Sequence, residues 1–152
     1  MENKIRPIRN NLIIELHVPD FIKVKQFYGV LGFSEIHFDL ATKEHPAYLV
    51  LRRSDPLGDT MINFYGGDDR VYNQSYFKKF SKETKRGYSV EITVSTANVS
   101  EFFNKVSQGE LKGYIVEELK EFKEGGSVWK DFRMEDPFGF YLRFTELVDW
   151  GQ

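Results

Sequence analysis

The sequence predicts an α+β fold made of two βαβββ modules, and two observations support this prediction. The same order of patterns occurs twice along the chain: a strand of alternating apolar residues, an amphipathic helix and three further strands. In both copies a valine ends the first strand and an aromatic pair lies in the helix that follows. These residues are Val18, Phe27 and Tyr28 in the first copy, and Val94, Phe102 and Phe103 in the second. A repeat of this kind indicates duplicated structural units.

The first predicted module spans about residues 11–67. Its opening strand, 11–18, places Leu12, Ile14, Leu16 and Val18 on one face. A helix is predicted over 21–31, because apolar residues recur there at spacings of three and four, with Asp20 as the N-cap and Gly32 just past the end. Strands are then predicted over 33–40, 47–53 and 60–66.

A polar bridge with an aromatic middle, residues 68–87, separates the modules and predicts a short helix. The second module, about 88–147, begins with a strand over 88–95 that places Tyr88, Val90, Ile92 and Val94 on one face. A helix is predicted over 98–108, followed by strands over 113–122, 127–135 and 139–147. The last two strands are joined by a tight turn at Asp136-Pro137-Phe138-Gly139. We therefore expect one domain, residues 1–152.

Composition excludes several classes of function. The chain of 152 residues has a net charge of -2 and no basic stripe of the kind that binds nucleic acid. It contains no cysteine, so thiolate catalysis, disulfides and cysteine-type zinc sites are excluded. No apolar run is long enough to cross a membrane, and residues 1–10 lack the apolar core of a signal peptide. We expect a cytoplasmic protein that binds neither nucleic acid nor membrane.

Two segments, "LHVPDFIKVKQFYGVLGF" from Leu16 and "RMEDPFGFYLRFTE" from Arg133, resemble the vicinal oxygen chelate superfamily. This superfamily includes glyoxalases, extradiol dioxygenases and bleomycin resistance proteins. The resemblance covers roughly residues 11–147. It implies that the paired modules curl into an open, U-shaped half-barrel, with helices on the convex side and a ligand in the cleft.

Alternation along the strands indicates which side chains face that cleft, because the apolar residues must meet the helices. The cleft residues predicted in this way are Ile13, Glu15 and His17; Met61, Asn63 and Tyr65; Ser89, Glu91 and Thr93; and Tyr141, Arg143 and Thr145.

Metal-dependent members of the superfamily place one ligand on each of four strands, and the resemblance maps those positions onto Ile13, Asn63, Ser89 and Arg143. Isoleucine cannot ligate, and a guanidinium has no lone pair to offer. Asparagine and serine replace imidazole and carboxylate poorly. The expectation is therefore no metal and no cofactor, with a divalent ion as the alternative.

Arg143 is the first candidate for ligand binding, because a cation on a strand's concave face needs a partner. It is expected either to pair with Glu15 or Glu91, or to bind the anionic or carbonyl end of a ligand. The full predicted ligand-binding set is Arg143, Glu91, Asn63, Tyr65, Tyr141, Trp129 and Tyr48. Glu15 and His17 share a strand face, so they form either a simple hydrogen-bonded pair or a proton-transfer unit with a catalytic role.

Two functions remain open from the sequence. The first is a metal-independent binding protein of the bleomycin-resistance type, which sequesters a small organic molecule. The second is an enzyme: a lyase or dioxygenase with a metal displaced to Glu15, His17 and Glu91, or an isomerase using Glu15 and His17. A homodimer is predicted because Trp129, Trp150 and the segment 72–80 add more large apolar groups than one small core hides. The ligand, and whether the cleft lies within one chain or across the dimer, stay open.

Overall fold

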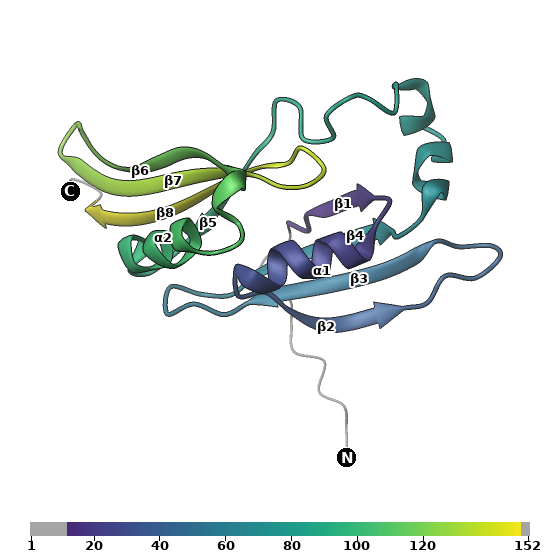
Figure 1. The fold of residues 1–152 in the computed structure, drawn as a ribbon, viewed down its shortest axis with the longest axis horizontal. Helices are drawn as coiled ribbons and strands as arrows, with labels where there is room; N and C mark the ends of the chain where they lie inside the picture. Colours follow the sequence, from purple (N-terminus) through teal and green to yellow (C-terminus); the bar gives the residue numbers. More distant parts are fainter. Residues whose placement is uncertain (1–11, 150–152) are drawn as a thin grey trace, which may run out of the picture.

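The computed structural model describes residues 12–149 and has the predicted α+β architecture of two βαβββ modules (Figure 1). The first contains β1 (Glu15–Val18), α1 (Phe21–Val30), β2 (Ser34–Asp39), β3 (Ala47–Arg53) and β4 (Thr60–Gly66). The second contains β5 (Glu91–Ser95), α2 (Val99–Gln108), β6 (Ile115–Glu124), β7 (Ser127–Glu135) and β8 (Tyr141–Asp149), with a short 3-10 helix, η3 (Lys112–Tyr114), before β6. The bridge carries two more short 3-10 helices, η1 (Asp69–Asn73) and η2 (Phe77–Lys79).

The two sheets share one topology. Their strand orders are β1-β4-β3-β2 and β5-β8-β7-β6, and neither sheet is closed. In each sheet the first strand pairs in parallel with the last, and the other pairs are antiparallel. The parallel pair requires a crossover, which α1 and α2 provide. The internal repeat seen in the sequence is therefore a repeat of structure.

Local chemistry sets the limits of α1. The carboxylate of Asp20 accepts hydrogen bonds from the backbone N–H groups of Ile22 (2.9 Å) and Lys23 (3.1 Å), as the predicted N-cap should. The helix ends before Gly32, whose φ of +89° lies in the left-handed region that glycine adopts without strain. The predicted apolar stripe is buried throughout: Phe21, Val24, Phe27, Tyr28 and Leu31.

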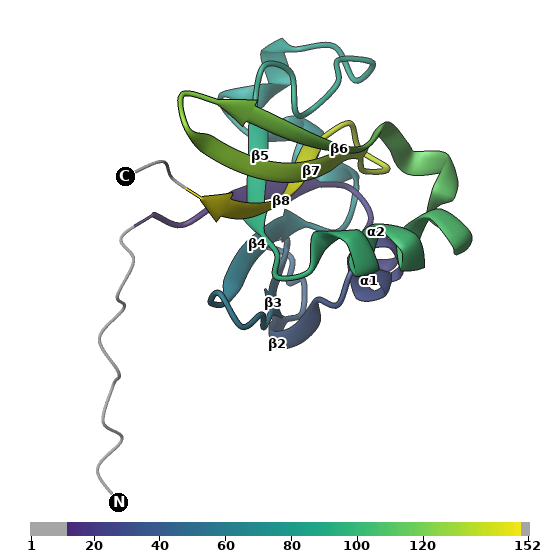
Figure 2. The same cartoon turned by 90° about the vertical axis from the view of Figure 1, so that its left-hand side faces the viewer.

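The helix-covered faces of the two sheets contribute to a single hydrophobic core. Figure 2 shows α1 and α2 on the same side of the molecule, between the two sheets. The rings of Phe27 in α1 and Tyr114 in η3 lie 5.1 Å apart. The hydroxyl of Tyr28 donates to Oδ2 of Asp136 in the β7–β8 turn, at 2.8 Å. The turn motif of the second module is thus bonded to the helix of the first.

A second buried contact joins the modules through charge. Arg53, at the end of β3, forms an ion pair with Asp55 (3.1 Å), and its Nε donates to the carbonyl of Leu31. The Asp55 carboxylate in turn accepts from the backbone N–H of Ala97, which precedes α2. The Arg53 guanidinium also lies 4.9 Å from the ring centroid of Phe102. Both charges are therefore compensated, as buried charges must be.

Three predicted core residues are exposed instead. Tyr88 is 81% exposed and Val90 54%, because the backbone of Ser89 has a φ of +59° that interrupts the extended chain, so β5 begins only at Glu91. Leu12 is 72% exposed, since β1 begins at Glu15. Trp150 and the predicted first residue of module one, Asn11, lie outside the described residues.

Candidate functional site

The strand residues that point away from the shared core form two open faces. We define the first open face by Glu15, His17, Tyr48, Asn63 and Tyr65, and the second by Glu91, Asp131, Arg133, Tyr141 and Arg143. Pairing of β1, β3 and β4 aligns the members of the first face, and pairing of β5, β7 and β8 aligns those of the second. Within residues 12–149, no hydrogen bond or ion pair links one face to the other.

The first open face carries a small polar network. His17 Nε2 lies 3.0 Å from Oε1 of Glu15, and the Asn63 side-chain amide donates to the Tyr48 hydroxyl at 2.7 Å. The ring of Tyr65 lies 4.9 Å from that of His17. The structure therefore brings three predicted ligand-binding residues, Tyr48, Asn63 and Tyr65, together with the two catalytic candidates.

The Tyr48 phenol stays protonated in this setting. Burial raises its pKa above the ordinary value, the hydrogen bond from Asn63 acts in the opposite direction, and the neighbouring Glu15 carboxylate raises it again. The phenol is consequently a neutral hydrogen-bonding group at physiological pH, and it offers no anionic oxygen to a metal.

On the second open face, Arg143 is held by a carboxylate that the sequence analysis did not single out. Its Nε donates to Oδ2 of Asp131 at 2.8 Å, and its Nη2 lies 2.6 Å from the same oxygen. Glu91 lies farther away, at 3.6 Å, while the other expected partner, Glu15, sits on the other sheet beside His17. Of the two carboxylates expected to pair with Arg143, Glu91 lies within ion-pair distance and Glu15 does not, because Glu15 is in β1 of one sheet and Arg143 is in β8 of the other.

Asp131 explains why an arginine stands in an apolar strand. It is 1% exposed, and a buried carboxylate without a cation would be strongly unfavourable. In β7 it alternates with the core residues Phe132 and Met134, so it shares a face with Arg133. That alternation was visible in the sequence, but the cross-strand register that places Asp131 beside Arg143 was not.

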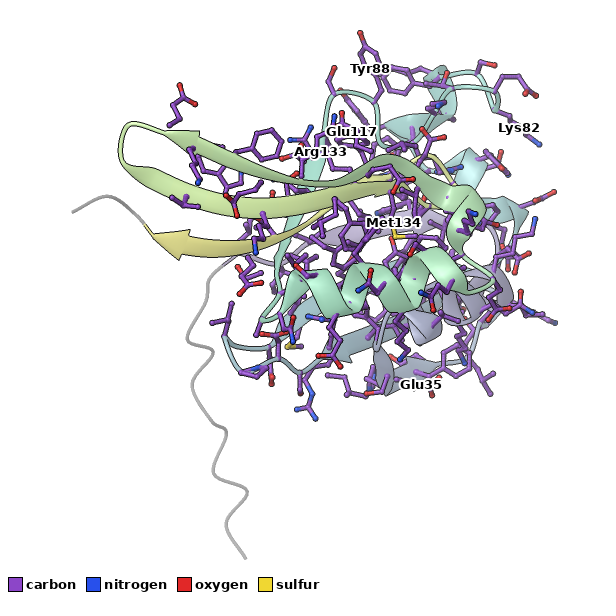
Figure 3. The ribbon with its side chains drawn as sticks, turned by 60° about the vertical axis from the view of Figure 1, so that its left-hand side comes forward. Glu35, Lys82, Tyr88, Glu117, Arg133 and Met134 are labelled. Carbon is purple, nitrogen blue, oxygen red and sulfur yellow. The ribbon has the colours of Figure 1, made fainter. Side chains whose placement is uncertain are left out.

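Arg133 forms a looser set of contacts. Its Nη1 lies 3.4 Å from Oε2 of Glu117 and 3.4 Å from the Tyr141 hydroxyl, which itself donates to Glu117 at 3.3 Å. The hydrogen bond with Tyr141 raises the pKa of Arg133, so the guanidinium remains cationic. Figure 3 shows Arg133 and Glu117 on the side of the sheet away from α2, and Met134 on the side of α2.

The remaining predicted aromatic, Trp129, lies near one end of β7. Its ring stacks on Phe122 of β6, with centroids 5.4 Å apart and planes inclined by 15°. Among the described residues its ring contact is with Phe122, and no hydrogen bond joins it to the polar groups of the second open face, although it lies in the same strand as Asp131 and Arg133.

The four positions that the resemblance assigned to metal ligands supply few donors. Ile13 is 60% exposed and precedes β1, while Ser89 lies outside β5 in a left-handed turn. The Asn63 amide is engaged by Tyr48, and Arg143 by Asp131. Among residues 12–149 no group of three or more His, Asp or Glu side chains is placed to hold a metal ion. The displaced set of Glu15, His17 and Glu91 is split between the two sheets.

A cavity of about 370 Å³ lies between β1 and the bridge. Its walls include His17, Tyr72, Phe77, Lys82 and Arg86. None of the ligand-binding residues predicted from the sequence lines it. The signal that could have revealed it is the interleaving of aromatic and basic residues from 72 to 88, which the sequence analysis related only to a short helix and to dimerisation.

No helix among the described residues has both the length and the apolar character required to cross a membrane.

Comparison with known proteins identifies the fold. No protein-family model matches the sequence, and no curated protein matches it closely.

Solved structures do match along most of the chain. TioX from a Micromonospora species is 17% identical, with a TM-score of 0.59 over 90% of this chain and 95% of that one. A bleomycin-binding protein complexed with bleomycin is 19% identical, with a TM-score of 0.58 over 90% and 98% of the two chains. A glyoxalase/bleomycin resistance protein/dioxygenase from Alicyclobacillus acidocaldarius is 20% identical, with a TM-score of 0.54 over 93% and 96%.

Proposed function

We propose that this chain, which has the fold of the glyoxalase/bleomycin resistance/dioxygenase superfamily, is a metal-independent protein that binds and sequesters a small organic molecule. One observation carries the proposal: the side chains at the four ligand positions, Ile13, Asn63, Ser89 and Arg143, leave no shell for a divalent ion. The Asn63 amide and the Arg143 guanidinium are instead engaged by neighbouring protein groups.

The open faces supply what a binding site for an organic molecule needs. Aromatic rings such as Tyr48, Tyr65 and Tyr141 offer surfaces for stacking, and fixed polar groups such as Asn63 and Arg143 orient a ligand. Both faces are open to solvent within one chain. A second copy that laid its second open face over the first open face would enclose a ligand between them.

The proposal therefore includes a homodimer, located in the cytoplasm. Ile13 is 60% exposed and Met61 51% exposed, and both lie at the edge of the first open face. Exposed apolar groups beside a polar face are typical of protein interfaces. In a dimer of this kind, the seven predicted ligand-binding residues would contribute from two chains.

The matching protein that contains bleomycin supports a small molecule as the occupant, without identifying it for this chain. Bleomycin is cationic, and a chain with a net charge of only -2 attracts such a ligand weakly over distance. We therefore propose a small, aromatic or polar organic molecule rather than bleomycin.

Native mass spectrometry and elemental analysis of the freshly purified protein test the proposal together. We expect a non-covalently bound organic mass and no stoichiometric metal. Nickel, zinc, manganese or iron that remains at one equivalent after dialysis would refute metal independence and favour the lyase or dioxygenase alternative.

One observation favours the acid–base alternative. Glu15 lies 3.0 Å from His17 Nε2, while Nδ1 of the same ring is buried and has no hydrogen-bond partner among residues 12–149. A carboxylate that orients an imidazole is a common proton-transfer arrangement. Incubation of the co-purified molecule in D2O separates the two functions: deuterium incorporation that is lost in His17→Gln would indicate an isomerase, and its absence in the wild type would favour binding alone.

A further inference from the structure

We propose that the cavity beneath the bridge binds an aromatic carboxylate, with Arg86 as the residue that recognises the acid group. The inference deepens the proposed function by naming a class of ligand, and it rests on that function only in taking a small molecule as the occupant. The cavity, of about 370 Å³, lies within the range typical of ligand pockets, about 300–1,000 Å³.

Arg86 is a half-buried guanidinium that has no carboxylate partner in the described part of the chain. Its Nη1 donates to the backbone carbonyl of His17 at 2.8 Å, and its Cζ atom lies 4.8 Å from the ring centroid of Tyr72. Within residues 12–149 it forms no ion pair, unlike Arg53, Arg70, Arg133 and Arg143. The backbone contact uses one of five N–H donors, so most of a planar fork suited to a carboxylate is left free.

The balance of charge around the cavity favours an anion. Lys82, Lys85 and Arg86 line it, against the single carboxylate of Glu15. Lys85 is neutralised by Glu135, with contacts of 2.9 and 2.6 Å, and Glu15 is engaged by His17. Lys82 forms no ion pair among the described residues; its ammonium lies 4.6 Å from the ring of Tyr72. Two cations therefore remain uncompensated beside the cavity. Figure 3 shows Lys82 at the outer edge of the bridge.

The walls of the cavity favour an aromatic body on that anion. Tyr72, Phe77, Phe80 and Phe140 all line it. Phe77 is 39% exposed and Phe80 50% exposed, although both rings face a concave surface where an apolar ligand would cover them. Aromatic rings gain from stacking and edge contacts beyond the area they bury. A planar ring with one acid group matches both the apolar walls and the two uncompensated cations, Lys82 and Arg86.

One part of the cavity wall is polar. His17 lies in the wall, with its ring 5.1 Å from that of Phe77, and its Nδ1 has no hydrogen-bond partner among the described residues. A buried nitrogen of this kind is rarely left unpaired. The backbone carbonyl of His17 accepts the hydrogen bond from Arg86, so the imidazole and the guanidinium border the same cavity.

Isothermal titration calorimetry with three probes that share one ring system tests the inference. The probes are 2-naphthoate, the neutral 2-naphthamide and the cationic 2-naphthylmethylammonium. We expect the naphthoate to bind the full-length protein at least about tenfold more tightly than the amide, as one charge-assisted hydrogen bond requires, and the cation to bind most weakly.

Two lysines of the bridge provide a matched pair of variants. Lys82→Glu reverses a charge that lines the cavity, whereas Lys79→Glu reverses one on the same segment that does not line it. Both lysines lie over tyrosine rings, at 4.6 Å for Lys82 and 3.8 Å for Lys79, and Lys79 also lies 5.3 Å from the ring centroid of Phe80. We expect Lys82→Glu to weaken naphthoate binding about tenfold and to leave amide binding unchanged, while Lys79→Glu leaves both unchanged. Arg86→Gln should abolish the preference for the acid.

Equal affinities for acid and amide in the wild type would overturn the inference. So would equal losses in Lys82→Glu and Lys79→Glu, which would indicate a long-range effect of charge. Neither result would remove the proposed function, because an organic molecule of another class found by native mass spectrometry would still support it. Conversely, stoichiometric metal would refute the proposed function and leave a selective response to naphthoate unaffected.

Discussion

The carboxyl group of Asp136 should make the stability of this protein fall as the pH rises from 4 to 7. Asp136 is buried in the β7–β8 turn, where it accepts hydrogen bonds from the Tyr28 hydroxyl and from the backbone N–H groups of Phe138 and Phe140. Burial raises its pKa from 3.8 to about 6, although those hydrogen bonds act in the opposite direction. Ionisation of this group is therefore harder in the folded state than in the unfolded state.

The sign and size of the effect follow from proton linkage. Because the folded-state pKa is the higher one, the folded protein binds more protons than the unfolded chain between pH 3.8 and 6. The contribution of Asp136 is fully present below 3.8 and is lost as the pH rises through 6. A shift of about two pKa units corresponds to about 3 kcal/mol in total, of which about 2.4 kcal/mol falls between pH 4 and pH 7.

Urea unfolding of the wild type and of Asp136→Asn at several pH values measures this contribution. The amide keeps an oxygen that accepts from the two backbone N–H groups, and its nitrogen can donate to Tyr28. The free energy of unfolding of Asp136→Asn minus that of the wild type should increase by about 2.4 kcal/mol between pH 4 and 7. Asp59→Asn, at an exposed surface pair, is the matched control and should leave the slope unchanged. Parallel pH profiles for the wild type and Asp136→Asn would refute the reasoning.

Three further predictions concern Arg143 and association. Arg143→Leu should destabilise the fold by about 3–5 kcal/mol in urea unfolding, because Asp131 would lose its close cation in a buried position; a change below about 1 kcal/mol would mean that Arg143 serves a ligand and not the fold. Arg143→Glu should still bind no nickel or zinc at micromolar concentration in calorimetry, since Ile13 and Ser89 supply no ligands, and tight binding would show that the cleft is misplaced. Light scattering should give the mass of a dimer, and a monomer mass at high protein concentration would contradict this.

The sequence was sufficient to predict the two α-helices and the eight strands found among residues 12–149, because each of their signals is local. Alternation along β4, the cap at Asp20 and the stripe of α1 depend only on neighbouring residues. The prediction failed at the start of β5, where Ser89 adopts a left-handed conformation that is uncommon for serine and gives no warning in the sequence. An alternating pattern cannot reveal such an interruption.

The sites were predicted less completely, because they depend on contacts between distant residues. The members of each open face followed from alternation, yet the partner of Arg143 depended on the register between β7 and β8. The cavity beneath the bridge depended on how an aperiodic segment folds back onto β1. Neither the register nor the path of an aperiodic segment leaves a periodic trace that sequence reasoning can use.

The contrast between Arg143 and Arg86 indicates whether the second open face or the cavity beneath the bridge binds a ligand's acid group more favourably. On the second open face two guanidinium groups, Arg133 and Arg143, face three carboxylates, those of Glu91, Glu117 and Asp131. An acid that entered there would have to displace a carboxylate already in place, and it would leave that carboxylate unpaired. Arg86 has no such partner to exchange among residues 12–149. A ligand's acid group therefore gains a new ion pair beneath the bridge, whereas on the second open face it could only replace an existing one.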